Sequence, residues 1–183
     1  MKVQFLERLS LAAVAAVTLS GSAAAQQPPT PGPEHKVLAM DAGTWDATVE
    51  MFMPGAPPMV SKGTEVNTMG CGGLCLISDF KGDFGGMPFH GHGTSTWDPN
   101  KKKYVGTWTD SMSSGLSLSE GSYDAAAKTA TSTMEGPDPT GKIVKSKAVL
   151  EYKDDNTRVM SMFTTGPDGK DVPTMKVRYT KRP

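Results

Sequence analysis

Residues 79–112 read DFKGDFGGMPFHGHGTSTWDPNKKKYVGTWTDSM, and this stretch decides the fold. It holds two of the three histidines, and two of the three tryptophans lie on either side of its turn, Asp98-Pro99-Asn100-Lys101. Beyond that turn, residues 104–112 alternate with a period of two, so they should pair back against the preceding strand. The stretch therefore predicts an antiparallel hairpin.

The same alternation continues along the chain from residue 43. In the first run, Trp45, Ala47 and Val49 share one face while Thr44 and Asp46 share the other, which is typical of a strand with one buried face. About ten such runs are expected. They are Thr44–Met53, Val60–Met69, Leu74–Asp83, Phe89–Trp97, Lys103–Met112, Leu116–Asp124, Thr129–Glu135, Ile143–Glu151, Thr157–Thr164 and Val172–Thr180.

Short turns separate these runs, and they favour an antiparallel meander because no connection is long enough for a crossover. About ten strands in one small domain would most economically close into an up-and-down barrel, which leaves no exposed edge. An open sandwich is the alternative. Before the first strand, Glu34–Ala42 predicts one short helix that Gly43 would end. We therefore expect an all-β protein with one N-terminal helix and with Trp45 buried at the base of the barrel.

The N-terminus predicts export. Residues 1–25 combine a basic start, an apolar run at Leu9–Leu19 and the small residues Ala23-Ala24-Ala25, which is the pattern of a cleaved signal peptide. An apolar run of about a dozen residues is too short to span a bilayer, which takes ~20. Residues 26–33 predict a proline-rich linker and 34–183 the barrel domain of a periplasmic or secreted protein.

Charge narrows the range of partners. Without Lys2, Arg8 and Glu7, the 19 basic and 19 acidic side chains become 17 and 18. A nearly neutral protein has no electrostatic basis for binding nucleic acid or an anionic membrane surface. No membrane insertion is expected after signal cleavage. The basic run Lys101-Lys102-Lys103 lies at a turn, where we expect a solvated loop tip.

Short stretches between Pro33 and Tyr179 carry a family resemblance. They are Pro33-Glu34-His35, Gly43-Thr44-Trp45, Lys62-Gly63-Thr64-Glu65, Gly72-Gly73-Leu74, Phe80-Lys81-Gly82, Gly91-His92-Gly93, Asp98-Pro99, Lys103-Tyr104-Val105-Gly106-Thr107-Trp108, Asp110-Ser111-Met112, Glu120-Gly121-Ser122-Tyr123-Asp124, Gly136-Pro137-Asp138-Pro139 and Gly166-Pro167-Asp168-Gly169. On these stretches the chain resembles the bacterial DUF1579 proteins, a family of unknown function. A short helix followed by Gly43-Thr44-Trp45 is also similar to the opening of the calycin barrels, the lipocalin and fatty-acid-binding group.

This resemblance implies a calycin-like barrel in which Trp45 closes the floor, and it implies no activity. The chain departs from the family pattern at three positions. His90 stands where a small polar residue is usual, and Cys71 and Cys75 stand where apolar residues are usual. Chemistry built on these three residues would be peculiar to this chain.

The histidine pair is a candidate site. On an extended strand, His90 and His92 leave the same face with Cα atoms roughly 6.6 Å apart, so they could share one ligand. With Asp110 they could bind a metal or form a His–Asp pair for proton transfer. An odd-numbered loop between Trp97 and Tyr104 would place His92 and Asp110 on one face, and an even-numbered loop would separate them. Alternatively, the neighbouring glycines allow close strand approach and the histidines bond threonines or water.

Bulky side chains indicate which face of the hairpin points inward. Tyr104, Trp108, Asp110 and Met112 share a face, and an outward orientation would expose a large apolar patch. A buried Asp110 then needs a partner, for which His92 is the nearest candidate. Glu120, on one face with two leucines, could be a further anchor or lie in water. The predicted ligand-binding residues are Trp45, His92, Tyr104, Trp108, Asp110, Met112 and Glu120.

Methionines recur at alternating positions in Met51-Phe52-Met53 and Met160-Ser161-Met162. Alternating positions on a strand are where a barrel places its lining residues, and methionine fills irregular apolar space well. Thioethers also suit Cu(I), so a copper site is the alternative. We expect the methionines to line the barrel.

Cys71 and Cys75 are the two cysteines of the chain. Export to an oxidising compartment favours a disulfide between them. On a straight strand their Cα atoms would lie ~13 Å apart, whereas a disulfide tolerates about 7 Å, so Gly72-Gly73-Leu74 must form a tight turn. Free buried thiols and a Cys/His metal site are the alternatives.

Three functions of different class remain open. The preferred one is an exported barrel whose cavity, lined by Met, Trp and Tyr, holds a small apolar or amphipathic molecule. The second is an enzyme or metal-binding protein that uses His90 and His92 with Asp110 or Glu120, although the sequence has no phosphate loop, nucleophile elbow, Cys-x-x-Cys or His-Glu-x-x-His motif. The third is a packed structural or stress-related envelope protein without a pocket. The ligand, any cofactor and the oligomeric state are unknown from the sequence.

Overall fold

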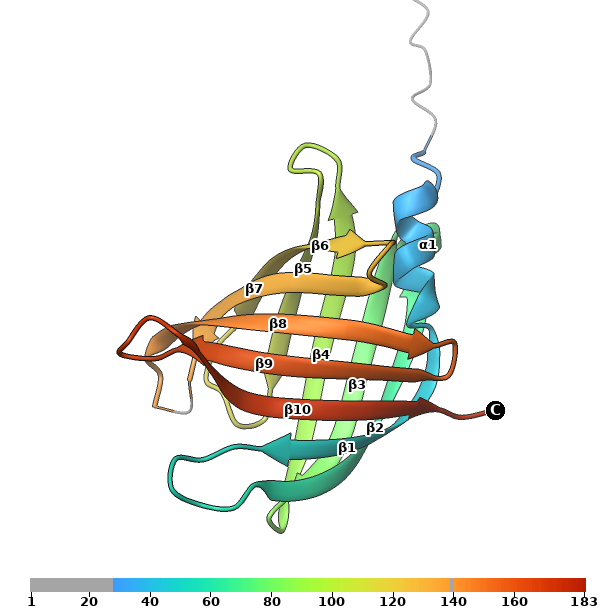
Figure 1. Cartoon of the computed structure of the whole chain (residues 1–183). Coiled ribbons are helices and arrows are strands. Elements are labelled where there is room, and N and C mark those ends of the chain that lie inside the picture. Colours follow the sequence, from blue (N-terminus) through green and yellow to red (C-terminus); the bar gives the residue numbers. More distant parts are fainter. Residues whose placement is uncertain (1–27, 139) are drawn as a thin grey trace, which may run out of the picture.

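The protein forms a closed barrel of ten antiparallel strands with one short helix, here as a computed structural model that describes residues 28–138 and 140–183 (Figure 1). The elements are α1 (Pro33–Met40), β1 (Gly43–Met51), β2 (Met59–Gly70), a 3-10 turn η1 (Cys71–Gly73), β3 (Cys75–Phe84), β4 (Met87–Asp98), β5 (Lys103–Asp110), β6 (Ser117–Asp124), β7 (Thr129–Pro137), β8 (Ile143–Asp154), β9 (Thr157–Thr165) and β10 (Asp171–Lys181).

Each period-two run of the sequence corresponds to one strand, so the predicted up-and-down barrel is confirmed and the open sandwich is wrong. Every strand pairs with its sequence neighbours, and β1 closes the barrel by pairing with β10. The predicted helix is confirmed as α1, which begins at Pro33, a position where the missing N–H of proline costs nothing.

The predicted signal peptide and the first residues of the linker lie outside the described residues. In the part of the chain that is described, no helix is long and apolar enough to cross a membrane.

The barrel has two different ends. At the helix end, α1 packs on β3 and β4, and the strands are joined by the turns 71–74, 99–102, 125–128 and 155–156. At the far end, the connections are 52–58, 85–86, 111–116, 138–142 and 166–170. Because consecutive strands run in opposite directions, all turns of one set lie at the same end (Figure 1).

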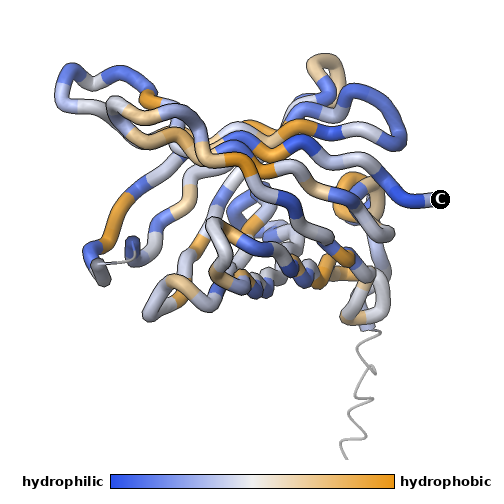
Figure 2. The backbone as a smooth tube through the Cα atoms, turned by 90° about the horizontal axis from the view of Figure 1, so that it is seen from below, coloured by the Kyte–Doolittle hydropathy of each residue, from blue (hydrophilic) through white to orange (hydrophobic). Residues whose placement is uncertain are grey.

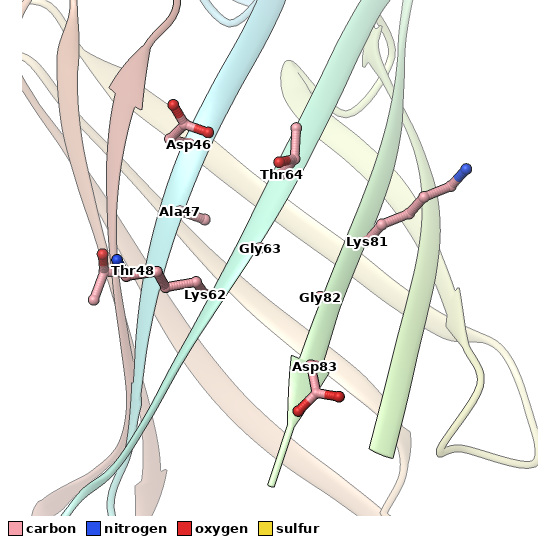
Figure 3. Close-up of a pocket in the computed structure, with 9 residues that line it drawn as sticks. All are labelled: Asp46, Ala47, Thr48, Lys62, Gly63, Thr64, Lys81, Gly82 and Asp83. Atoms are coloured by element: carbon pink, nitrogen blue, oxygen red, sulfur yellow. The ribbon is translucent and has the colours of Figure 1, made fainter. Parts of the chain in front are cut away.

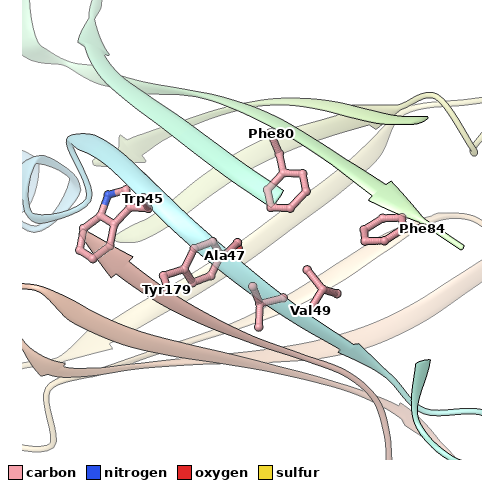
Figure 4. Packing of buried hydrophobic residues seen from close by; sticks show 7 residues of the cluster. Trp45, Ala47, Val49, Phe80, Phe84 and Tyr179 are labelled. Atoms are coloured by element: carbon pink, nitrogen blue, oxygen red, sulfur yellow. The ribbon is translucent and has the colours of Figure 1, made fainter. Parts of the chain in front are cut away.

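The inner face of the barrel follows from the strand register, since directly paired residues of antiparallel strands point to the same face. Trp45 pairs with Glu65 and Lys181, so these three residues face inward together. Hydrophobic and hydrophilic residues are interleaved along the strands in Figure 2, as this alternation requires. The buried apolar cluster lies on β1, β3 and β10 (Figure 4) and consists of Trp45, Ala47, Val49, Phe80, Phe84, Val177 and Tyr179.

A buried group of charged and polar residues closes the helix end, and we name it the ionic floor: Asp41, Glu65, Asn67, Tyr152 and Arg158. The Arg158 guanidinium donates to the Asp41 carboxylate through Nη1 and to Glu65 Oε1 through Nη2, the latter at 2.5 Å. Its side chain is only 3% exposed. The guanidinium carbon lies 4.2 Å from the Trp45 ring centroid and 4.5 Å from that of Tyr179, so the cation is held between two aromatic faces.

The ionic floor also connects elements that are distant in sequence. Asn67 Nδ2 donates to the backbone oxygen of Asp41 at 3.0 Å and to Glu65 Oε1 at 2.8 Å. The Trp45 indole donates to the same backbone oxygen at 2.8 Å, and the Tyr152 hydroxyl donates to Asp41 Oδ2 at 3.1 Å. The C-cap of α1 is therefore bonded to four strands, which fixes the helix across the end of the barrel.

The pKa values of the ionic floor reflect its burial and its excess of carboxylates. Burial raises the pKa of Asp41 above its usual range, against the opposing effect of Arg158. Burial would lower the pKa of Arg158, but the charges of Asp41 and Glu65 raise it overall. The pKa values of the Tyr152 and Tyr179 hydroxyls are also raised by burial and by the nearby carboxylates. One guanidinium thus faces two carboxylates in a poorly solvated place.

The disulfide joins Cys71 and Cys75 across η1, with Cα atoms 5.5 Å apart. The tight turn that such a bridge needs is present, because Gly72 and Gly73 have φ values of 66° and 90°. Only glycine adopts this left-handed region at little cost, so the two glycines make the short loop possible. Neither cysteine is free, and the alternatives of buried thiols and a Cys/His metal site are wrong for this structure.

We predict that Arg158→Met destabilises the protein by about 3–5 kcal/mol, because it leaves two buried carboxylates without their cation. Arg178→Met is the matched control, since Arg178 is exposed on the neighbouring strand and should change stability by less than about 0.5 kcal/mol. Urea unfolding of both variants measures the difference. Equal losses in the two variants would contradict the role of the ionic floor.

The raised pKa of Asp41 predicts a pH dependence. The folded state holds the Asp41 proton to higher pH than the unfolded chain does, so this contribution is complete below about pH 4 and is lost as pH rises through the folded pKa. Asp41→Asn removes the titrating proton. We expect the unfolding free energy to fall less between pH 4 and pH 7 in this variant than in the wild type, as measured by urea unfolding across that range.

Reduction of the disulfide should weaken the barrel without unfolding it. A loop this short contributes about 2 kcal/mol on the chain-entropy model. The expected result is a lower urea midpoint after reduction and alkylation, with the circular dichroism spectrum still dominated by strands. Loss of the strand signal at zero urea would show that the bridge is required for folding.

Candidate functional site

The register of the β4–β5 hairpin separates the two halves of the predicted polar anchor. Trp97 pairs with Tyr104, which leaves the even-numbered segment 98–103 between them. Asp110 pairs with Gly91 and faces inward, whereas His92 pairs with Thr109 and faces outward. The prediction that His92 and Asp110 anchor one pocket is therefore wrong, and so is any acid–base pair or metal site that needs both residues on one face.

His90 and His92 lie on the outer surface of β4. His92 Nδ1 is 2.7 Å from Asp79 Oδ1, and both side chains are more than half exposed. The two histidines line an open hollow of about 290 Å³ together with Asp79 and Lys81. Within residues 28–138 and 140–183, no group of three or more His, Cys, Asp or Glu side chains is arranged to hold a metal ion. The partner of the His92 ring is thus the Asp79 carboxylate, whereas the structural interpretation expected threonines or water.

Trp108 faces inward, and its ring occupies the space that side chains at Gly91 and Gly93, on either side of His92, would need. A Cβ atom at Gly91 would overlap the Trp108 ring, and one at Gly93 would lie 2.9 Å from its Cε3 atom. The missing side chains let the indole lie across β4 and pack against the buried apolar cluster. The glycines therefore position Trp108.

Asp110 faces inward as predicted, but its hydrogen-bond partners come from its own strand and loop. Trp108 Nε1 donates to Oδ2 at 3.0 Å, the Met112 backbone N–H donates to Oδ1 at 2.9 Å, and the Ser113 hydroxyl lies 3.3 Å from Oδ2. The carboxylate thus fixes the indole and the start of the 111–116 connection. It needs no histidine partner.

Three other predicted ligand-binding residues lie in different places. Met112 follows the end of β5 and is exposed, so it is not a wall of the interior. Glu120 pairs with Val105 on the outer face, where Lys101 and Lys103 bind it and lower the pKa of its carboxyl. Placing Met112 and Glu120 in a pocket was wrong, because β5 ends before Met112 and β6 turns Glu120 outward.

The inward-facing aromatic residues differ in role. Trp45 is 1% exposed and belongs to the floor of the barrel. Tyr104 is half-buried, packs edge-on against Trp97 and donates from its hydroxyl to the Glu34 backbone oxygen at 3.1 Å, so it ties α1 to β5. Burial and the Glu34 charge raise the pKa of Tyr104. Of the predicted walls, Trp108 is the one that lies deeper inside the barrel.

Small residues lie together on part of the inner face of β4–β8, and we name this surface the inner wall. Its members are Ser95, Gly106, Ser117, Ser119, Gly121, Ser132 and Ser146, which the strand register connects into one continuous surface. All of them are only partly buried, although they point to the inside of the barrel. Inward methionines on β7, β9 and β10, namely Met134, Met160, Met162 and Met175, are also partly buried.

The inner wall is the candidate site, because its residues face inward and yet stay partly solvent-accessible. The contrast with the buried cluster on β1, β3 and β10 is clear, since its members are nearly inaccessible. Met51, Met160 and Met162 lie on inner faces as the alternating pattern predicted, whereas Met53 lies in the 52–58 connection and is exposed, so that part of the prediction was wrong. The interior therefore combines small polar residues with an apolar side of Trp108 and methionine.

An open hollow of about 600 Å³ lies on the outer face of β1–β3 (Figure 3). Its outward side chains carry both signs of charge, from Asp46 and Asp83 and from Lys62 and Lys81. Asp46 is already paired with Arg182 at 2.6 Å, which lowers its pKa. This hollow is open and carries charges of both signs, and we do not assign it a function.

Sequence reasoning missed the ionic floor and the inner wall. Arg158 could have been noticed, because it alternates with Met160 and Met162 and so carries a charge on the apolar face of its strand. The partners of Arg158 could not have been predicted, because Asp41 and Glu65 come from segments that are distant in the sequence. In β6 the pattern was misleading, as Ser117 and Ser119 face inward while Leu118 faces outward.

Comparison with known proteins supports the fold and the family. No curated protein matches the sequence. The crystal structure of Rv2717c from M. tuberculosis has a TM-score of 0.60 at 12% identity, over 83% of this chain and 99% of that chain. The S-type phycobiliprotein lyase CPES from Guillardia theta has a TM-score of 0.54 at 9% identity, over 82% of this chain and 93% of that chain.

A de novo designed fluorescence-activating β-barrel is more distant, with a TM-score of 0.44 at 13% identity over 80% of this chain and 97% of that chain. For the first two structures, whose TM-scores exceed 0.5, identities this low show a shared fold and nothing about function. The sequence itself gives the closer relationship, because residues 30–181 match the family described as protein of unknown function DUF1579. The chain therefore belongs to the DUF1579 family.

Proposed function

We propose that this protein binds a small molecule inside its barrel, against the inner wall. The observation that carries the proposal is that Ser95, Ser117, Ser119 and Ser132 point inward from the strands and yet remain solvent-accessible. A barrel whose only role is structural gains stability by filling its interior with large side chains. Leaving serine and glycine over five neighbouring strands gives up that packing, which is consistent with space reserved for a ligand.

The chemistry of the interior favours an amphipathic ligand. Trp108 and the inward methionines provide apolar contact, and methionine adapts to ligands of irregular shape. The serine hydroxyls provide hydrogen bonds from the opposite side. In the ionic floor, Arg158 Nε and Asn67 Oδ1 are buried and have no hydrogen-bond partner within the described chain, so they would pair with a polar group at one end of the ligand.

The place of action that we propose is outside the cytoplasm. The disulfide between Cys71 and Cys75 supports the export predicted from residues 1–25, because structural disulfides persist mainly in oxidising compartments. The ligand is then a molecule that an exported protein meets in the periplasm or outside the cell.

The proposal predicts that Ser119→Phe weakens binding of an environment-sensitive apolar dye by at least about ten-fold, because the aromatic ring would occupy the space at the inner wall. Leu118→Phe is the matched control. It adds a similar side chain on the same strand at the next position, which faces outward and is exposed, so dye binding should stay unchanged. Fluorescence titration of protein from residue 26 onward gives the affinities.

Two further results complete this test. Trp108→Ala should also weaken dye binding, since it removes the apolar side of the interior. Fluorescence of the remaining tryptophans and circular dichroism verify that each variant is folded. If the wild type binds no dye, or if Ser119→Phe and Leu118→Phe weaken binding equally, the interior is not the binding site and the packed structural alternative takes its place.

A further inference from the structure

Exposed apolar side chains gather at the far end of the barrel. Every one of the five far-end connections carries at least one in the connection or within two residues of it: Met53, Val60, Met87, Met112, Leu116, Leu118, Ile143 and Val172. Their exposed fractions lie between 38% and 62%. Because these connections surround the end of the barrel, the apolar side chains form a ring, which we name the apolar ring.

Charged residues are scarce in three of the far-end connections and present in two of the helix-end turns. The connections 52–58, 85–86 and 111–116 contain no charged residue, whereas the helix-end turns 99–102 and 125–128 carry lysines. The connections 138–142 and 166–170 each carry one acidic and one basic residue, Asp138 with Lys142 and Asp168 with Lys170, and ion pairs hold several other charges near the apolar ring. Lys145 pairs with Glu135, Lys147 with Asp171 and Lys170 with Asp168, at 3.1, 2.8 and 3.5 Å. The far end is therefore apolar without being cationic.

We infer that the apolar ring docks the barrel, far end first, onto an electrically neutral lipid surface. Separate loop tips with one or two aliphatic side chains each can enter the interface of a bilayer without a complementary shape on the partner. The ring has no arginine, a residue enriched at the centres of protein interfaces, and its apolar side chains stand on separate connections instead of in one compact patch. Methionine suits the irregular interior of a lipid layer.

The ring is a surface contact and does not require the barrel to span the membrane. It also acts without the electrostatic attraction that the nearly neutral chain lacks. The inference does not depend on a ligand inside the barrel. It does explain why β6 exposes Leu116 and Leu118 while turning serines inward, since the leucines then serve the surface of the far end.

The test is flotation of protein from residue 26 onward with phosphatidylcholine vesicles, because residues 9–19 would bind lipid by themselves. The wild type should float with the vesicles, and the double variant Met112→Ser/Leu116→Ser should partition at least about ten-fold less. The matched control is Met40→Ser/Val66→Ser. It removes two apolar side chains of similar exposure, 37% and 44%, that lie away from the ring, and it should partition like the wild type.

The salt dependence of vesicle binding and the behaviour of Ser119→Phe distinguish lipid docking from charge-driven binding and from ligand binding inside the barrel. Binding that is unchanged between 50 and about 500 mM salt supports docking by apolar contact, and binding lost at high salt overturns it. Ser119→Phe should float normally, so a failure of the dye experiment and a failure of docking are distinguishable. If the wild type does not float, the inference is wrong. If the protein instead forms dimers that Met112→Ser/Leu116→Ser dissociates, the ring binds a second copy and lipid docking is overturned.

Discussion

The buried guanidinium of Arg158 is the point on which the barrel depends. A cation inside a protein is costly unless it is paired and hydrogen-bonded, and Arg158 meets both conditions through Asp41 and Glu65. The aromatic faces of Trp45 and Tyr179 cover the rest of it. These partners come from the C-cap of α1 and from strands at both ends of the sequence, so the pairing can exist only when the barrel is closed.

This arrangement leaves the two halves of the interior with different properties. Around β1, β3 and β10, large side chains pack on the ionic floor and on one another. Around β4–β8, glycine and serine occupy part of the inner face, beside large side chains such as Tyr104 and Met134. Trp108 lies between the two regions because Gly91 and Gly93 give it room. The two halves therefore differ in how completely their inward side chains are buried.

The fold could be predicted from the sequence because period-two alternation and short turns are local signals, and each strand carries its own. The burial of Trp45 at the base of the barrel was also predicted correctly, because its face of the strand and its position after α1 both indicate it. The site was harder to predict for two reasons. Whether His92 and Asp110 share a face depends on the parity of one loop, which composition does not reveal. In β6 the hydrophobic residues are the outer ones, so the usual assignment of the apolar face to the interior failed at Glu120 and Leu118.

Barrel closure has a consequence for how the chain folds. Nine of the ten strand pairings join consecutive strands and close only short loops, whereas the tenth joins Trp45 on β1 to Lys181 on β10. Pairings between distant parts of a chain are slow to form, since the entropy of a long loop must be lost first. We therefore expect the seam between β1 and β10 to form last. A chain emerging from the N-terminus onward would wait as an open, curved sheet with unpaired edges until its last strand arrives, and in that interval it is most exposed to misassembly.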